Sequence, residues 1–162
     1  MNRINLISLR SVIYISTFVV VIDQSTKYLA AQIDQYTINF EIIPMLLNLR
    51  LVKNTGAAFS LFSNSTFILS LLSLMVSIVI IIWTIKNSPL KIAEGLFISF
   101  LLGGTIGNGI DRWRLGYVID FIELIPIKFP IFNVADISIN IAVIILLVDT
   151  IRRARIRDDL RC

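Results

Sequence analysis

Four long apolar stretches, separated by segments with more polar residues, set the pattern of this chain. Residues 66–85 form the clearest stretch, a run of 20 residues without a charged side chain. A helix needs about 20 mostly apolar residues to cross the hydrocarbon core of a membrane. Residues 11–33, 92–110 and 136–151 form less uniform stretches, with one or two charged residues each. The pattern predicts four transmembrane helices.

The last stretch is the least certain in length, because its uncharged part, residues 137–148, has only 12 residues. To span a membrane, this helix has to include Asp136 at the membrane boundary or draw in part of residues 129–135. The prediction for this helix therefore places an acidic side chain at the start of a membrane span.

Basic residues in short flanking segments predict the orientation, since lysine and arginine are enriched on the cytoplasmic side. They lie before the first stretch, between the second and third, and after the fourth: Arg3, Arg10, Lys86, Lys91, Arg152, Arg153, Arg155, Arg157 and Arg161. Both termini are therefore predicted to be cytoplasmic. Residues 32–65 and 111–135 then face the other side.

The first of these outer segments has a short period-two pattern, with apolar residues at 38, 40 and 42 and again at 47, 49 and 51, and with Pro44 between. Such alternation predicts a pair of short strands lying on the membrane surface. We expect an all-α integral membrane protein with one domain over residues 1–162. A small β element and a short loop or helix should lie on the non-cytoplasmic side.

Composition agrees with a membrane protein. The chain is 56% hydrophobic and 16% charged, whereas soluble domains carry about 25% charged residues. The sequence pI near 9.5 does not indicate nucleic-acid binding, because the basic residues gather in the C-terminal tail without interleaved aromatic residues. We also expect no cleavable signal peptide, because the first apolar stretch ends without a small-residue cleavage site.

The chemistry available to the chain is limited by its side chains. It contains no histidine and one cysteine, Cys162 at the end of the charged tail. Nucleophiles activated by histidine, histidine-based metal sites and an internal disulfide are therefore excluded. We interpret Cys162 as having no catalytic role.

Ionisable residues inside apolar stretches mark functional sites by default. Asp23 and Lys27 lie four residues apart, so they share a helix face and can neutralise each other. The simplest interpretation is a supporting intrahelical pair. Asn108, Asp111 and Arg112 close the third stretch, after glycines that permit close helix packing.

Two further acids, Asp120 and Asp136, are each surrounded by apolar residues, with no basic residue within four positions. A turn for Asp120 and a helix N-cap for Asp136 are the structural alternatives. Without histidine, however, a carboxylate pair is the best remaining acid–base machinery. Two carboxyl groups held close in a low dielectric do not both ionise readily, so one acts as base and the other as acid.

Five segments of the chain, in order, resemble the lipoprotein signal peptidases, the type II signal peptidases of bacteria. They are residues 23–27 (DQSTK), 54–59 (NTGAAF), 103–112 (GGTIGNGIDR), 118–121 (VIDF) and 132–136 (FNVAD). The resemblance covers nearly the whole chain. Gly109 and Asn140 depart from it, and we expect them to affect only fine packing.

The resemblance implies an aspartyl endopeptidase of the bacterial cytoplasmic membrane, which removes the signal peptide of diacylglyceryl-modified prolipoproteins just before the lipidated cysteine. It implies that Asp120 and Asp136 are catalytic. Substrate binding and orientation of the carboxylates fall to Asn54, Asn108, Arg112 and Asn133, and supporting roles to Asp23, Lys27, Gly56 and Asp111. Residues 37–62 would form a surface cradle for the substrate.

The implied active site lies near the outer face of the membrane and needs no cofactor or metal. The expected partners are the lipid-modified substrates and membrane lipid; nucleic acid is not expected, and no oligomer is implied. Two other functions stay open on the sequence, a small proton-coupled transporter and an assembly subunit. A transporter would also keep acids inside a bundle, but four spans with acids at one end give it no continuous polar path. An assembly subunit gives no reason for two isolated aspartates with asparagines nearby.

Overall fold

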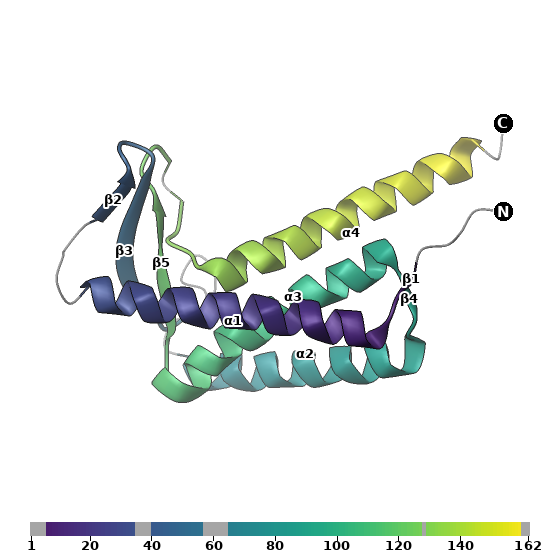
Figure 1. The fold of residues 1–162 in the computed structure, drawn as a ribbon, viewed down its shortest axis with the longest axis horizontal. Coiled ribbons are helices and arrows are strands. Elements are labelled where there is room, and N and C mark those ends of the chain that lie inside the picture. The colour runs from purple at the N-terminus through teal and green to yellow at the C-terminus, as the bar shows by residue number, and fades with distance from the viewer. Residues whose placement is uncertain (1–5, 35–39, 57–64, 128, 160–162) are drawn as a thin grey trace.

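A computed structural model describes residues 6–34, 40–56, 65–127 and 129–159. Four long helices run side by side, and a small sheet covers one end of them (Figure 1). The helices are α1 (Leu9–Asp34), α2 (Thr66–Asn87), α3 (Ile92–Leu115) and α4 (Val134–Asp159). The prediction of a mostly helical protein with a small β element is confirmed.

Three of the helices are long and apolar enough to cross a membrane, judged by length and composition among the described residues. They are α2, α3 and the part of α4 from Val134 to Arg157, with mean hydropathies of 2.7, 1.2 and 2.2. The first predicted span is present as the 26-residue helix α1. It does not meet the same hydropathy criterion, and it carries Asp23 and Lys27 in its second half.

Two helix ends differ from the predicted ends. The third predicted span stopped at residue 110, but α3 continues to Leu115 and so includes Asp111 and Arg112. The fourth helix begins at Val134 and runs on through the arginines of the tail. An apolar pattern marks the part of a helix that lies in lipid, whereas hydrogen bonding and capping decide where the helix ends.

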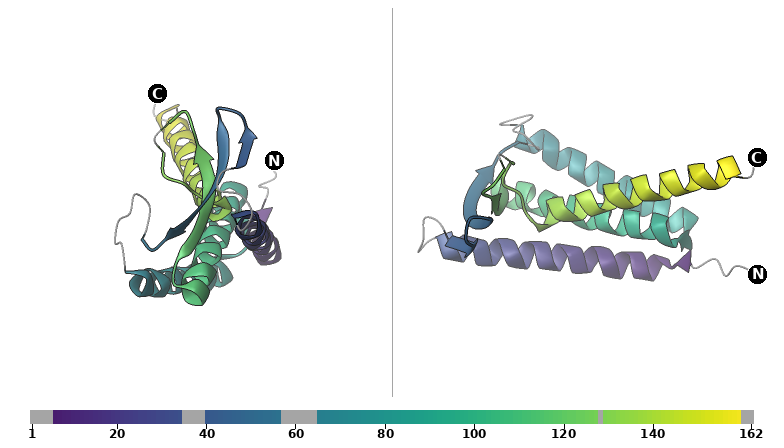
Figure 2. Two further views of the ribbon diagram at one scale, coloured as in Figure 1. Left: turned by 90° about the vertical axis from the view of Figure 1, so that its left-hand side faces the viewer. Right: turned by 90° about the horizontal axis from the view of Figure 1, so that it is seen from above.

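The three-stranded sheet has the order β2–β3–β5 and is antiparallel. The strands β2 (Phe40–Ile43) and β3 (Leu47–Asn54) are the predicted pair, and β5 (Val118–Leu124) was not predicted as a strand. At the opposite end of the helices, β1 (Leu6–Ile7) pairs with β4 (Leu90–Lys91), as Figure 2 helps to show. The predicted cradle at 37–62 lies partly outside the described residues.

The helix α3 is the centre of the bundle, because it packs against α1, α2 and α4. Small residues allow this contact. A Cβ at Gly104 would lie 2.5 Å from the Ala135 carbonyl oxygen of α4, and one at Gly107 would lie 2.6 Å from a carboxylate oxygen of Asp23 in α1. These glycines let two neighbouring helices approach α3 more closely than any larger residue would permit.

The side chains of α2 are distributed as expected of a helix in lipid. Its buried residues include Ser70, Ser77 and Thr84, whose hydroxyl groups each donate to the backbone carbonyl four residues earlier. Large apolar side chains such as Phe67 and Val79 are exposed, at 72% and 64%. Small side chains facing the protein and large apolar ones facing outward are typical of membrane helices.

We expect Gly104→Ala to weaken the packing of α3 against α4 and to lower the melting temperature. Overpacking a tight contact costs about 1–3 kcal/mol, and here the clash is with backbone. Gly109→Ala is the matched control, because a Cβ there would meet Ser73 Cβ at 3.4 Å, an ordinary contact. Thermal unfolding in detergent measures both variants, and equal melting temperatures would contradict the packing role of Gly104.

Candidate active site

A cluster of three buried charged side chains joins α1 to α3. Lys27 is 1% exposed, and its Nζ lies 2.9 Å from a carboxylate oxygen of Asp23 and 2.9 Å from one of Asp111. The expected pair of Asp23 and Lys27 is therefore present, but it is part of a larger cluster. In the described part of the chain Asp111 pairs with Lys27 and not with its neighbour Arg112.

The two carboxylates of this cluster also hold the backbone of the segments that carry the catalytic candidates. Asp111 Oδ2 accepts a hydrogen bond of 3.1 Å from the backbone N–H of Ile119 in β5. Asp23 Oδ1 accepts one of 2.8 Å from the backbone N–H of Ala135 in α4. Each contact is one residue away from a candidate aspartate, so the charged cluster sets the positions of both.

Two asparagines connect the candidate aspartates. Asn133 Nδ2 donates to Asp120 Oδ1 at 2.7 Å, and Asn108 Nδ2 donates to Asp136 Oδ1 at 2.8 Å. The network continues between the asparagines, where Asn133 Nδ2 lies 3.0 Å from Asn108 Oδ1. Lys27 Nζ donates to the same Asn108 oxygen at 2.9 Å. The amide side chains therefore link the two carboxylates to each other and to the charged cluster.

The start of α4 fixes Asp136. The backbone N–H of Asp136 donates to Asn133 Oδ1 at 3.0 Å, and the backbone N–H of Asn133 donates to Asp136 Oδ2 at 3.1 Å. This reciprocal pair has the pattern of a capping box. Asn133 therefore caps the helix, and the alternative of Asp136 as N-cap is wrong. Asp136 uses one oxygen for the cap and the other for Asn108.

Asp120 lies in the middle of β5, with Val52 of β3 as its cross-strand neighbour. It is 3% exposed. The turn considered for this residue is therefore not what the structure shows. Asn54, at the end of β3, donates to Asp120 Oδ2 at 2.8 Å. Diagonal neighbours on one face of a sheet lie within reach of each other, which explains why a residue paired with Val118 contacts Asp120.

Burial raises the pKa of Asp120 to about 6, because the charged carboxylate loses water. The hydrogen bond from Asn54 opposes this shift, since it stabilises the charged form, and the nearby charge of Asp136 adds to it. Asp120 is thus a carboxyl group that keeps its proton over a wider pH range than an ordinary aspartate.

Both aspartates line one cavity of about 930 Å³, beneath the sheet and between α2, α3 and α4. Its polar lining includes Asn54, Asn108 and Arg112. Arg112 Nη2 donates to the Gly56 carbonyl at 3.2 Å, while its buried Nε finds no acceptor among the described residues. A buried donor left without a partner is costly, so this part of the cavity is suited to a ligand with an oxygen acceptor.

All ten residues singled out in the sequence lie together at this end of the bundle: Asp23, Lys27, Asn54, Gly56, Asn108, Asp111, Arg112, Asp120, Asn133 and Asp136. Gln24 was missed. Its Nε2 donates to Asp111 Oδ1 at 2.9 Å and to the Gly107 carbonyl at 3.1 Å. Its place between Asp23 and Lys27 in an otherwise apolar helix was the available signal.

Asn140 was expected to affect only fine packing, but it lines the cavity one helical turn beyond Asp136. Its position four residues after Asp136 on a helix could have indicated this. Among the described residues no group of three or more His, Cys, Asp or Glu side chains is arranged to hold a metal ion. The site thus offers two carboxyl groups, one that can donate a proton and one that can accept a proton, beside a cavity of about 930 Å³.

Comparisons with known proteins agree with this geometry. The family model of signal peptidase (SPase) II matches residues 15–152. A lipoprotein signal peptidase of Parasynechococcus marenigrum is 54% identical over 136 residues, which are 83% of this chain and 85% of that protein. The lipoprotein signal peptidase of Enterococcus faecalis is 42% identical over 134 residues, 83% of each chain.

Solved structures give the same result for the fold. One bacterial membrane enzyme superposes with a TM-score of 0.81 at 34% identity, and 90% of each chain is covered. Another superposes with a TM-score of 0.76 at 35% identity, over 88% of this chain and 93% of that one. The transporter and assembly-subunit alternatives find no such support. The family match, the relatives and the fold together show that this chain belongs to the signal peptidase II family, the lipoprotein signal peptidases, and is a membrane protease.

Proposed function

We propose that Asp120 and Asp136 are the catalytic pair of an aspartyl endopeptidase, which cleaves diacylglyceryl-modified prolipoproteins just before the lipidated cysteine. The observation that carries this proposal is that both carboxylates line one cavity and are linked through Asn108 and Asn133. The relatives are named as lipoprotein signal peptidases, which supports the substrate class.

The roles of the two acids follow from their surroundings. Asp120, with its pKa raised to about 6, is the better proton donor. Asp136 is half-buried, accepts hydrogen bonds from Asn108 and from the backbone of Asn133, and is the second carboxylate on the cavity. We therefore assign Asp120 as the acid and Asp136 as the base.

Hydrolysis then proceeds by acid–base catalysis. Asp136 takes a proton from a water molecule, the water oxygen bonds to the scissile carbonyl carbon, and Asp120 gives its proton to the carbonyl oxygen. The tetrahedral intermediate collapses when Asp136 passes its proton to the leaving amine of the cysteine and the C–N bond breaks. The proton on the former carbonyl oxygen returns to Asp120, so both acids regain their starting states.

Arg112 and Asn54 are the candidates for holding the substrate backbone. The Nε of Arg112, which has no acceptor among the described residues, and its Nη2 contact to Gly56 place a guanidinium in the cavity wall. A peptide carbonyl in an apolar site needs a donor, and the guanidinium supplies it. The lipid chain of the substrate would reach this cavity from the bilayer, beside the outward apolar faces of α2 and α4.

The decisive test uses a diacylglyceryl-modified prolipoprotein and the purified protein, with cleavage followed by gel shift. We expect Asp120→Asn and Asp136→Asn each to lower turnover by on the order of 10²–10⁴-fold, the contribution of a positioned acid or base. Circular dichroism and thermal unfolding should show that both variants fold. Near-normal turnover by either variant would remove that residue from the mechanism. A substrate without the lipid is the control for substrate class.

The pH dependence tests the assignment of Asp120 as the acid. Its pKa of about 6 in the free enzyme implies that kcat/KM falls as the pH rises through that value, because the proton donor is lost. Asn54 stabilises the charged form, so Asn54→Ala should raise the pKa and move this alkaline limb to higher pH. Asn140→Ala is the control, since Asn140 lines the same cavity and has no contact with Asp120 among the described hydrogen bonds. If the alkaline limb of the kcat/KM profile stays in place in Asn54→Ala, or moves equally in both variants, the group that titrates there is not Asp120.

We further infer four membrane crossings within a single domain, in the bacterial cytoplasmic membrane. At 1.5 Å per residue α1 is about 39 Å long, its outer face exposes apolar residues such as Phe18, and its buried charges are neutralised within the protein. The basic residues Lys86, Lys91 and those of the α4 tail lie at the end opposite the sheet (Figure 1). By the positive-inside rule this end is cytoplasmic and the active site faces outward.

Reporter fusions test this topology. A fusion at residue 88 and one after residue 157 should report a cytoplasmic position, and a fusion at residue 126 should report an external one. The reason is the placement of the basic residues at the ends of α2, α3 and α4. A cytoplasmic signal at residue 126 would place both aspartates on the wrong side for an exported substrate.

A further inference from the structure

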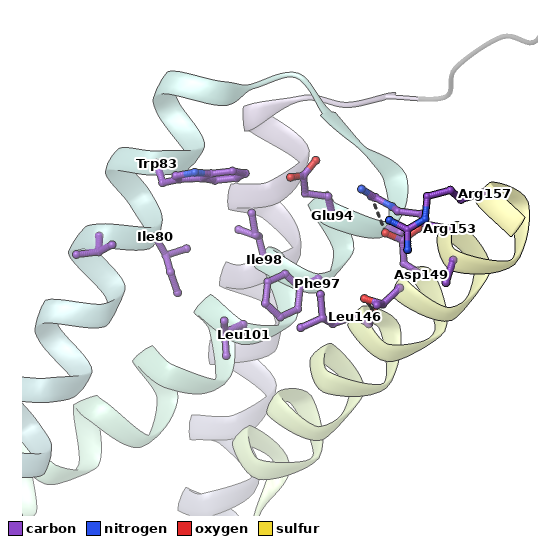
Figure 3. A pocket seen from close by; sticks show the side chains of 14 residues that line it. Ile80, Trp83, Glu94, Phe97, Ile98, Leu101, Leu146, Asp149, Arg153 and Arg157 are labelled. Atoms are coloured by element: carbon purple, nitrogen blue, oxygen red, sulfur yellow. Dashed lines mark hydrogen bonds and ion pairs between the residues drawn. The ribbon is translucent and has the colours of Figure 1, made fainter. Parts of the chain in front are cut away.

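A second cavity, of about 620 Å³, lies at the end of the bundle opposite the sheet, between α2, α3 and α4. Its walls are mostly apolar, with Ile80 from α2, Phe97 and Leu101 from α3, and Leu146 from α4 (Figure 3). Both α2 and α4 pack on α3, and they separate towards this end (Figures 1 and 2). The size is within the range of sites for small molecules, about 300–1,000 Å³.

The mouth of this cavity is charged. Arg153 and Arg157 are one turn apart on the face of α4 that lines it, and Glu94 lies on the wall formed by α3 (Figure 3). Arg153 Nη2 pairs with Asp149 at 2.6 Å, which leaves other guanidinium N–H groups available. Arg157 is exposed and makes no ion pair with any side chain that the structure describes. Two arginines therefore present donors at the entrance to an apolar space.

The level of the mouth matches a membrane surface. The candidate span in α4, judged by length and composition, includes Arg153 and extends to Arg157, and Trp83, on the α2 wall of the cavity, is 40% exposed. Tryptophan is enriched where the hydrocarbon core meets the headgroups. Basic pockets between membrane helices at this level bind anionic lipid headgroups.

We propose that this cavity is a binding site for one anionic membrane phospholipid, with an acyl chain between α2 and α4 and the phosphate held by Arg153 and Arg157. The apolar segment of the substrate is the other conceivable occupant. A signal peptide begins with a positively charged region, which Arg157 would repel, since it has no carboxylate partner among the described residues. A phosphate is attracted by the same arginines, because they can offer it paired N–H donors.

The test compares two double variants that remove the same charge. The full-length protein, purified in detergent and confirmed folded by circular dichroism, is titrated with phosphatidylglycerol and with phosphatidylcholine, and bound lipid is counted by native mass spectrometry. We expect wild type to prefer phosphatidylglycerol and Arg153→Gln/Arg157→Gln to bind it roughly 10- to 30-fold more weakly, from about 1 kcal/mol for each arginine. Arg152→Gln/Arg155→Gln should change little, because those exposed arginines do not line the cavity.

A third variant fills the cavity without changing charge. Ala93 lines it, so Ala93→Trp should also reduce the retention of phosphatidylglycerol, while glycerol phosphate without acyl chains should not bind wild type. Equal weakening in the two arginine double variants would overturn the proposal in favour of general attraction to the tail. Loss of prolipoprotein cleavage in Ala93→Trp with lipid retention unchanged would also overturn it, because the occupant would then be the substrate.

Discussion

The ion pairs of Lys27 inside the bundle hold together α1, α3 and the two segments that carry the candidate site. Its ammonium group is shared between Asp23 of α1 and Asp111 of α3, and breaking a buried ion pair by losing one partner costs about 3–5 kcal/mol. Asp23 accepts the backbone N–H of Ala135 at the start of α4 with its other oxygen, and Asp111 accepts the backbone N–H of Ile119 in β5 with the oxygen that pairs with Lys27. This cluster of one ammonium and two carboxylates joins two helices to the two segments that carry Asp120 and Asp136, so the position of the candidate site follows from the packing of the bundle.

The two ends of the bundle accommodate polar groups in different ways. At the sheet end, polar groups are buried and connected, since each amide between the aspartates donates and accepts at once. At the other end, polar groups lie at the rim of an apolar cavity and stay partly exposed. The physical reason is the same at both ends: a polar group inside a membrane protein needs a partner in the protein or access to the headgroup region. The first arrangement holds the proposed catalytic pair, and the second leaves an apolar cavity that we propose is filled by a lipid.

The asparagines explain how two carboxyl groups are held beside one cavity without an ion pair to either of them among the described residues. Asn54 and Asn133 donate to Asp120, while Asn108 donates to Asp136. Neutral donors stabilise a carboxylate less than a cation does, so they leave the pKa of Asp120 raised by burial, at about 6. A lysine or arginine in direct contact with it would favour the charged form and remove the proton donor that we propose for hydrolysis. Lys27 acts one step away, through the oxygen of Asn108.

The helices and the candidate site residues could be predicted from the sequence, because both leave local patterns. The uncharged run at residues 66–85 and the isolated acids Asp120 and Asp136 are visible without a structure, and the ten candidate residues do lie together. Three contacts could be seen only in the fold: Asp120 lies on a strand, Asn133 caps α4, and Asp111 pairs with Lys27 and not with Arg112. Each of these contacts joins residues whose pairing depends on how separate segments pack or on where a helix begins. The local pattern of apolar and polar residues indicates which side chains of a segment are buried, but not which residues of other segments contact them.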